Sequence, residues 1–261
     1  MQHSRREASC HALYSSPHLM EEPFLHIEEL ATGYGHGSRR HTVCRHLNGT
    51  LPRGTLTLLL GANGSGKSTL LRTLAGLQPP LAGRIGWGGQ DTARLTPGEL
   101  ARTLSIVLTT RPEAPLLTAA EVAEMGRIPY SRALRRPTQA DRVAVARAMA
   151  LTGTESLARR TLGTLSDGER QRVFLSKALA QETPAILLDE PTAFLDHPGK
   201  RHILRLLHRI AHEEGKLIIV STHDVELALH AADGVWLLRP DGIRTLTPEE
   251  AMSVGPEALF G

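Results

Sequence analysis

A glycine-rich segment of the chain has the residue types needed to bind a phosphate. Residues 61–68 read Gly-Ala-Asn-Gly-Ser-Gly-Lys-Ser and fit the pattern G-x-x-x-x-G-K-[ST] in full. Glycines let backbone N–H groups converge on a phosphate, and the start of a following helix adds partial positive charge. We therefore expect the amine of Lys67 to reach the β and γ phosphate oxygens of a nucleotide, and the hydroxyl of Ser68 to face Mg²⁺.

The sequence around this segment favours a nucleotide site over a glycine-rich turn that fits the pattern by chance. An apolar stretch typical of a buried strand precedes it, and a leucine-rich helical pattern follows it. The motif requires both of these elements. The residues predicted to contact the nucleotide are Gly61, Asn63, Gly64, Ser65, Gly66, Lys67, Ser68 and Thr69.

Two further apolar segments end in side chains that could act on a bound phosphate. The segment "AILLDE" delivers Asp189, which would hold Mg²⁺ in its second shell, and Glu190, which could orient or deprotonate an attacking water. The segment "LIIVSTHD" carries His223, whose imidazole could contact a γ-phosphate. Alone, such residues are more often solvated strand ends or packed histidines. Beside a complete phosphate loop we favour the catalytic interpretation.

The elements that position these residues follow an alternating pattern of short apolar strands and amphipathic helices, which predicts an α/β fold with crossover helices. The predicted strands are Phe24–Leu30, Thr55–Gly61, Ser105–Thr109, Ala185–Asp189, Lys216–Thr222 and Val235–Leu238. The residues after Leu238 suggest a hairpin and a closing helix. Between Arg111 and Arg160 only helical segments are expected, which indicates an all-helical insert.

Five predicted helices begin with a Ser or Thr followed three positions later by an acid, the spacing of a capping box. These starts are "TPGE", "TAAE", "TQAD", "SDGE" and "TPEE". In "SDGE" we expect the carboxylate of Glu169 to bend back to the backbone amide of Ser166. The helix after His197 should bury one face through Ile203, Leu206, Leu207 and Ile210.

Composition excludes several classes of protein. The 261 residues are 41% hydrophobic, enough for an ordinary core, but no apolar run approaches the roughly 20 residues of a membrane-spanning helix. Residues 1–23 form a polar tail without the apolar centre of a signal peptide, so we expect a cytoplasmic protein. Cys10 and Cys44 have no disulfide or metal-binding pattern. The net charge of +3, without a basic block, gives no support for a nucleic-acid partner.

Four motifs, "GANGSGKST", "LSDGERQRV", "ILLDEPTAFLD" and "STHD", occur in one order that resembles the ABC transporter ATPases over residues 24–238. The resemblance implies an α/β phosphate-loop NTPase core, with a mostly parallel sheet, an antiparallel N-terminal β part and a helical subdomain insert. It places the ATPase domain at residues 24–261 and the helical subdomain at about 111–165. ATP and Mg²⁺ are the implied nucleotide and metal.

The resemblance also implies a head-to-tail homodimer in which each ATP lies between one copy's phosphate loop and the other copy's signature loop. Ser166, Gly168 and Glu169 stand in the signature loop. Glu190 is similar to the family's catalytic carboxylate and His223 to its switch histidine. Asp167 stands where the family usually has glycine and would repel a γ-phosphate by roughly 1 kcal/mol or more at a few ångströms. We therefore predict that Asp167 points away or pairs with an arginine.

Two more residues take their expected roles from the resemblance, and one family residue is missing. Tyr34 in "ATGYG" is similar to the aromatic that stacks on adenine, with an exposed turn aromatic as the alternative. Asp196 in "TAFLD" is similar to the residue that links the two sites. The family's glutamine before the helical insert, a Mg²⁺ contact, is replaced here by Thr109 and Thr110. A threonine hydroxyl is shorter, so we expect Thr109 to act through an added water.

The stretch "LLTAAEVAEMGRIPYS" resembles the ATPases of iron-siderophore, haem and cobalamin importers, with an ordinary helix and loop as the alternative. The first functional hypothesis is therefore an ATPase subunit, peripheral on the inner face of the membrane, that works with integral-membrane permease subunits and indirectly with a substrate-binding protein. The second is an ABC ATPase not coupled to transport, which the lack of room for a long coiled coil disfavours. The third is a degenerate regulatory subunit, suggested by the missing glutamine.

Overall fold

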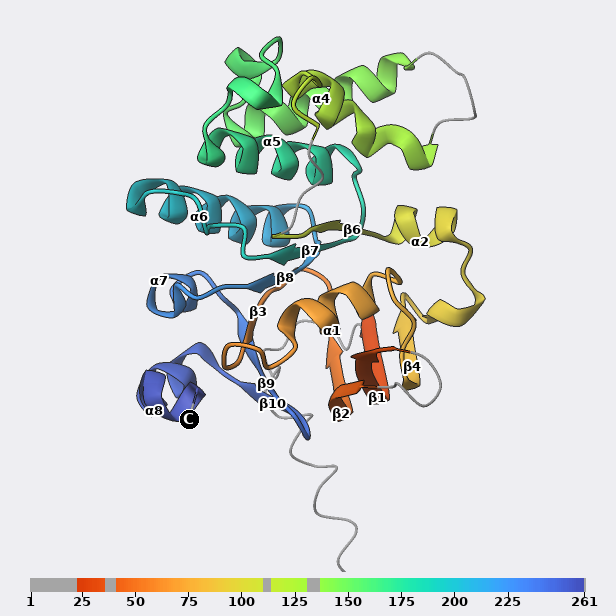
Figure 1. Cartoon of the computed structure of the whole chain (residues 1–261), viewed down its shortest axis with the longest axis vertical. Helices are drawn as coiled ribbons and strands as arrows, with labels where there is room; N and C mark the ends of the chain where they lie inside the picture. The colour runs from red at the N-terminus through yellow and green to blue at the C-terminus, as the bar shows by residue number, and fades with distance from the viewer. Residues whose placement is uncertain (1–22, 36–40, 110–113, 131–136, 261) are drawn as a thin grey trace, which may run out of the picture.

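The computed structural model describes residues 23–35, 41–109, 114–130 and 137–260 (Figure 1). The predicted polar tail, which includes Cys10, lies outside these residues except for Pro23. Thr110 lies outside them as well. Figure 1 shows an elongated molecule with helices α4 and α5 at one end and strands β1, β2 and β4 at the other. A large sheet lies between these two parts. Among the described residues no helix combines the length and the apolar character that crossing a bilayer requires.

The smaller sheet is antiparallel and has the strand order β2-β1-β4-β5. Its strands are β1 (Leu25–Tyr34), β2 (His41–Leu51), β4 (Ala82–Trp87) and β5 (Gln90–Asp91). The larger sheet has the order β10-β9-β3-β8-β7-β6 and is parallel except for β10. Its strands are β3 (Leu56–Leu60), β6 (Leu104–Val107), β7 (Ala185–Asp189), β8 (Leu217–Ser221), β9 (Gly234–Arg239) and β10 (Gly242–Leu246). This mixed α/β architecture confirms the predicted fold class.

Eight α-helices connect and cover these strands in the described part of the chain. They are α1 (Lys67–Leu74), α2 (Pro97–Thr103), α3 (Ala119–Glu124), α4 (Gln139–Thr152), α5 (Asp167–Ala180), α6 (His197–Glu213), α7 (Val225–Leu229) and α8 (Pro248–Phe260). The 3₁₀ segment η4 (Met125–Tyr130) follows α3 directly. Between β6 and β7 the described residues form helices and no strand, as the sequence predicted.

All five predicted capping boxes are present. At the starts of α2, α3, α4 and α5 the hydroxyl of the Ser or Thr accepts a hydrogen bond from the third helical amide. The carboxylate of that third residue accepts a hydrogen bond from the backbone amide of the Ser or Thr. At α8 the amide of Thr247 donates to Glu250, and the amide of Glu250 donates to the Thr247 hydroxyl. Each box satisfies two helix-end amides that would otherwise lack partners, so these helices begin where local sequence sets them.

The central sheet separates two hydrophobic cores, because side chains alternate faces along each strand. Leu58, Ile186 and Val220 belong to the core that α3 to α7 cover, whereas Leu59 and Leu187 belong to the core shared with α1 and the antiparallel sheet. The predicted buried face of α6, formed by Ile203, Leu206, Leu207 and Ile210, is confirmed. Burial on both faces explains why these strands appeared as continuous apolar runs.

Strands β2, β4 and β5 were not among the predicted strands. In β2, exposed polar side chains and three register shifts against β1 break the two-residue period that a strand prediction needs. Glu29 and His46 adopt positive φ angles of 44° and 54° at these irregularities. Strand β4 carries two glycines and is mostly exposed in its first half. Strand propensity therefore gave no signal there.

Candidate active site

The phosphate loop runs from the end of β3 to the first residue of α1, as the motif requires. Gly66 caps α1 with a φ of 98°, a conformation that favours glycine, and a Cβ there would lie 2.5 Å from Val43 Cγ1. A Cβ on Gly61 would lie 2.7 Å from Ser65 Oγ and 2.8 Å from the Leu238 carbonyl. The loop therefore needs glycine at both positions, because side chains would not fit.

The side chain of Lys67 lies inside this loop. Its Nζ donates to the carbonyl oxygens of Gly61 at 2.7 Å and Ala62 at 3.1 Å, and the residue is 8% exposed. Burial lowers the pKa of the Lys67 amine, while the carboxylates of Glu190 and Asp189 oppose that shift. The loop thus holds a buried amine beside two acids, an environment suited to polyphosphate and a divalent cation.

Polar groups of the loop are available for a ligand. Ser65 Oγ is buried and has no hydrogen-bond partner among the described residues. Such an orphaned buried hydroxyl is costly unless a ligand or water satisfies it. Together with the glycine-lined backbone and Lys67, this residue makes the chain's own groups fit a nucleotide phosphate.

The two predicted acids stand at the end of β7 and are fixed by Ser221 of the neighbouring strand β8. Asp189 is 2% exposed and accepts from Ser221 Oγ at 2.7 Å. The Ser221 hydroxyl in turn accepts from the backbone amide of Glu190 at 3.1 Å. The parallel register places Asp189 opposite Ser221. Sequence reasoning assigned Ser221 no role, because its position opposite Asp189 depends on a strand register that the sequence does not show.

The structure brings Glu190 and His223 together at the ends of the neighbouring strands β7 and β8. His223 Nε2 lies 2.7 Å from Glu190 Oε1, with half of the histidine side chain and 27% of the glutamate side chain exposed. Glu190 has a positive φ of 53°. Its carboxylate is partly exposed and lies in contact with an imidazole.

Thr109, the residue in place of the usual glutamine, lies beside these acids. Its hydroxyl donates to the backbone carbonyl of Asp189 at 3.1 Å. The hydroxyl therefore braces the strand that carries both acids. A water-mediated contact from Thr109 to Mg²⁺ stays a prediction.

The edge of the antiparallel sheet adjoins the phosphate loop. Tyr34 ends β1 with 58% of its surface exposed, and its ring lies 4.9 Å from that of His41, centroid to centroid. Two residue pairs further along β2, Cys44 is buried and its Sγ donates to the carbonyl of Ser65 at 3.1 Å. Cys44, for which we predicted no role, thus packs on the loop. The predicted stacking of Tyr34 on adenine stays a prediction.

The signature segment forms the start of α5. The Ser166 amide donates to Glu169 Oε2 at 2.8 Å, and this backbone hydrogen bond lowers the pKa of the Glu169 carboxyl. Asp167 Oδ1 lies 3.3 Å from Arg170 Nη2, and 65% of the Asp167 side chain is exposed. The predicted pairing of Asp167 with an arginine is confirmed.

Ser166 and Gly168 line a groove of about 870 Å³ together with Leu195 and Asp196. Asp196 caps α6, since its Oδ1 accepts from the Gly199 amide at 3.0 Å. None of residues 61–69 lines this groove. In the described part of one chain, the phosphate loop therefore does not contribute to the groove at the signature segment. The predicted linking role of Asp196 stays a prediction.

Comparison with known proteins decides the family. The family described as "ABC transporter" matches residues 44–193, more than half of the chain. The chain belongs to the ABC transporter family. Membership of this family makes it an ATP-binding protein and an ATPase, in agreement with the prediction from the four motifs.

The similarity to related ABC proteins extends over most of each protein. The achromobactin transport ATP-binding protein of Dickeya dadantii (strain 3937) is 40% identical over 206 residues, which cover 78% of this chain and 75% of that protein. The ferric enterobactin transport ATP-binding protein of Escherichia coli (strain K12) is 36% identical over 81% of this chain and 77% of its own. A dimeric ATP-binding cassette in a post-hydrolysis state, bound to ADP and Pi, superposes with a TM-score of 0.76 at 26% identity, covering 86% of this chain and 98% of that one.

A buried arginine organises the "GRIPY" segment of this ABC protein. Arg127 Nε donates to Asp141 Oδ1 at 2.9 Å, and Nη1 donates to Glu182 Oε2 at 2.8 Å and to the Ala180 carbonyl at 2.7 Å. The guanidinium also lies over the ring of Tyr130, 4.3 Å from its centroid. Sequence reasoning assigned Arg127 no individual role, since its partners come from three separate elements.

Replacing Arg127 with methionine is expected to lower the free energy of unfolding by about 3 to 5 kcal/mol, because Asp141 would keep a buried charge without its cation. Urea unfolding at pH 7 measures this loss. Arg142→Met, which removes an exposed arginine next to Asp141 on α4, is the control. An unchanged unfolding midpoint in Arg127→Met would contradict the prediction.

The contacts of Asp141 also make its contribution to stability depend on pH. Hydrogen bonds from Thr138, and then from Arg127, lower the pKa of Asp141 from 3.8 to about 2. A carboxyl whose pKa is lowered on folding stabilises the protein fully above its ordinary pKa and loses that contribution as the pH falls through its folded value. The stability gap between wild type and Asp141→Asn should therefore shrink between pH 4 and 2.

Proposed function

We propose that this chain is the ATP-hydrolysing subunit of an ABC importer for iron chelates, haem or cobalamin. The observation that carries the proposal is the convergence of the buried Lys67, the buried Asp189 and the Glu190–His223 pair at one end of the large sheet. The relatives described above support the importer assignment by their names, since they transport achromobactin and ferric enterobactin. A cobalamin import ATP-binding protein of Halobacterium salinarum is 40% identical over 180 residues, which cover 69% of this chain and 45% of that protein.

In this proposal the phosphate loop holds the β and γ phosphates of ATP. Lys67 supplies the positive charge, and the backbone amides and Ser65 Oγ supply hydrogen-bond donors. Ser68 would hold Mg²⁺, with Asp189 in its second shell, and the ion would neutralise charge on the phosphates. The ring of Tyr34, exposed beside the loop, would carry the adenine.

Glu190 is the proposed general base. Its carboxylate takes a proton from water, the water oxygen bonds to the γ-phosphorus, and the bond from phosphorus to the ADP oxygen breaks. The close contact of His223 Nε2 with Glu190 Oε1 would restrict the orientation of the Glu190 carboxylate. The Ser221 hydroxyl fixes its backbone. The site is thus arranged to orient one water rather than to form a covalent intermediate.

The separate location of the signature groove supports a homodimer. Ser166 and Gly168 of one copy would face the phosphate loop of the other, so that ATP binding closes the dimer and hydrolysis opens it. The helices from α3 to α5, about residues 111–165 and the start of α5, would contact integral-membrane permease subunits. In this proposal the chain lies on the cytoplasmic face of the membrane, and a substrate-binding protein acts from the other side.

Co-expression with the permease encoded nearest to this chain's gene tests the proposal. The expected result is that the chain fractionates with membranes only when the permease is present, and that ATP turnover rises in the complex. A chain that stays out of the membrane fraction with every co-expressed permease would support an ABC ATPase not coupled to transport. Uptake of ferric siderophore, haem and cobalamin by the reconstituted complex then separates the substrate classes.

A further inference from the structure

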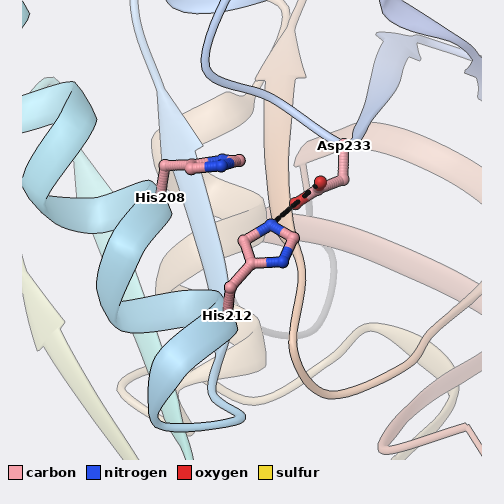
Figure 2. Close-up of side chains that lie close together, drawn as sticks. All are labelled: His208, His212 and Asp233. Carbon is pink, nitrogen blue, oxygen red and sulfur yellow. Dashed lines mark hydrogen bonds and ion pairs between the residues drawn. The ribbon is translucent and has the colours of Figure 1, made fainter.

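A second group of potential ligands lies away from the nucleotide site. His208 and His212 stand one turn apart on α6, and Asp233 lies in the segment before β9. One ligand atom from each of the three residues lies within 4.8 Å of the others. Figure 2 shows both imidazoles on the same side of α6, with the Asp233 carboxylate facing His212.

Neighbouring groups orient two of these three side chains as they are oriented in metal sites. His208 Nδ1 lies 2.9 Å from the carbonyl of Ala231. A carbonyl can only accept, so Nδ1 carries the proton and Nε2 keeps a lone pair. Asp233 Oδ2 accepts from the Leu56 amide at 2.7 Å, which anchors the carboxylate. Such outer contacts are typical of metal-binding histidines and carboxylates.

The third side chain already points at the carboxylate. His212 Nε2 lies 3.1 Å from both oxygens of Asp233. In a tetrahedral site with bonds of about 2.0 to 2.1 Å, ligand atoms are roughly 3.4 Å apart. His212 Nε2 and the Asp233 carboxylate are thus already at about this spacing. The third ligand atom, within 4.8 Å of the other two, needs to approach by at most about 1.4 Å.

We propose that His208, His212 and Asp233 bind one divalent transition-metal ion of the Zn²⁺ class. Two imidazole nitrogens and one carboxylate oxygen suit Zn²⁺, Ni²⁺ or Cu²⁺ better than Mg²⁺ or Ca²⁺, which prefer oxygen ligands. Three protein ligands leave a position open to water, as the exposure of the site allows.

The location of the site indicates its effect. The amide of Asp233 donates to the carbonyl of Leu56 at 2.9 Å, while the Leu56 amide donates back to the Asp233 side chain. Leu56 begins β3, the strand whose other end carries the phosphate loop. A bound ion would link the C-terminal half of α6 to the start of β3. The proposed catalytic acids lie at the other end of the sheet, at the end of β7. The ion therefore stabilises the fold without contributing a group to hydrolysis.

Metal titration of the full chain, stripped with chelator, tests the proposal. Zn²⁺ is added in competition with a chromophoric chelator to wild type, His208→Ala and His212→Ala, and also to His26→Ala, which removes an exposed histidine from β1 as the control. We expect one site in wild type and in His26→Ala. In His208→Ala and His212→Ala the affinity for Zn²⁺ should fall by more than roughly 10- to 100-fold, the loss caused by removing a group that only hydrogen-bonds to a metal ligand.

Thermal unfolding provides the second readout. Equimolar Zn²⁺ should raise the Tm of wild type and of His26→Ala, and leave the Tm of His208→Ala and His212→Ala unchanged. Each variant is compared with and without metal, so any loss of stability from the substitution itself cancels. Equal Zn²⁺ affinity in all four proteins, or no binding by wild type, would overturn the proposal. The first result would assign the metal to histidines elsewhere, including the three in residues 1–22.

Discussion

Glu190→Gln is expected to lower ATP turnover by about 100- to 10,000-fold while ATP still binds, the range associated with loss of a general base. The amide of glutamine keeps the size of the side chain and its contact with His223, but it cannot take a proton from water. Turnover is measured by phosphate release, with the permease present, and binding by a fluorescent ATP analogue. In the proposed cycle ATP binding closes the dimer before hydrolysis, so ATP should also hold the variant in its dimeric form.

The control for Glu190→Gln is Glu213→Gln, which neutralises an exposed acid at the end of α6. Its turnover should equal that of wild type. Full activity in Glu190→Gln would show that another residue is the general base. No turnover in either the variant or wild type would favour the degenerate site that Thr109 suggested, since the threonine braces the backbone of Asp189 instead of presenting an amide to the metal.

Lys67→Ala is expected to weaken ATP binding by at least about 10- to 100-fold, because a charged hydrogen bond contributes roughly 1.5 to 3 kcal/mol. The Lys67 amine is already buried against two loop carbonyls, so little reorganisation is needed when phosphate replaces or joins them. Isothermal titration with ATP measures the affinity directly. Hydrolysis should fall in parallel, since the same charge would face the γ-phosphate.

Lys177→Ala is the matched control, because burial lowers the pKa of this lysine as well but it lies on α5, outside the phosphate loop. Its ATP affinity should equal that of wild type. A thermal melt without nucleotide confirms that Lys67→Ala is folded, which matters because the variant loses the two hydrogen bonds to the loop. Unchanged ATP affinity in folded Lys67→Ala would place the nucleotide elsewhere.

Local sequence predicted the features of this molecule that depend on neighbours in the chain. The capping boxes, the phosphate loop and the buried face of α6 each arise from residues within one or two turns, so their spacing was sufficient. The apolar strands β3, β7 and β8 were also predictable, since burial on both faces leaves a continuous hydrophobic signal. The pairing of Asp167 with Arg170 belongs to the same class, because the two residues are one helical turn apart.

Features that depend on pairing between distant segments could not be predicted in this way. Ser221 reaches Asp189 only through the register of β7 and β8. Arg127 finds its partners on α4 and after α5. Strand β2 is held by its pairing with β1 in spite of bulges and exposed polar residues. In each case a contact across the fold outweighs the weak local preference of the sequence.

The left-handed backbone of Glu190 has a consequence for how this site evolves. A side chain in that conformation costs about 1 to 2 kcal/mol that glycine would avoid. Glycine, however, has no carboxylate to activate water. In the proposed mechanism, natural selection for turnover and natural selection for a stable fold therefore act in opposite directions on this one position. The rest of the chain must then supply the difference in stability.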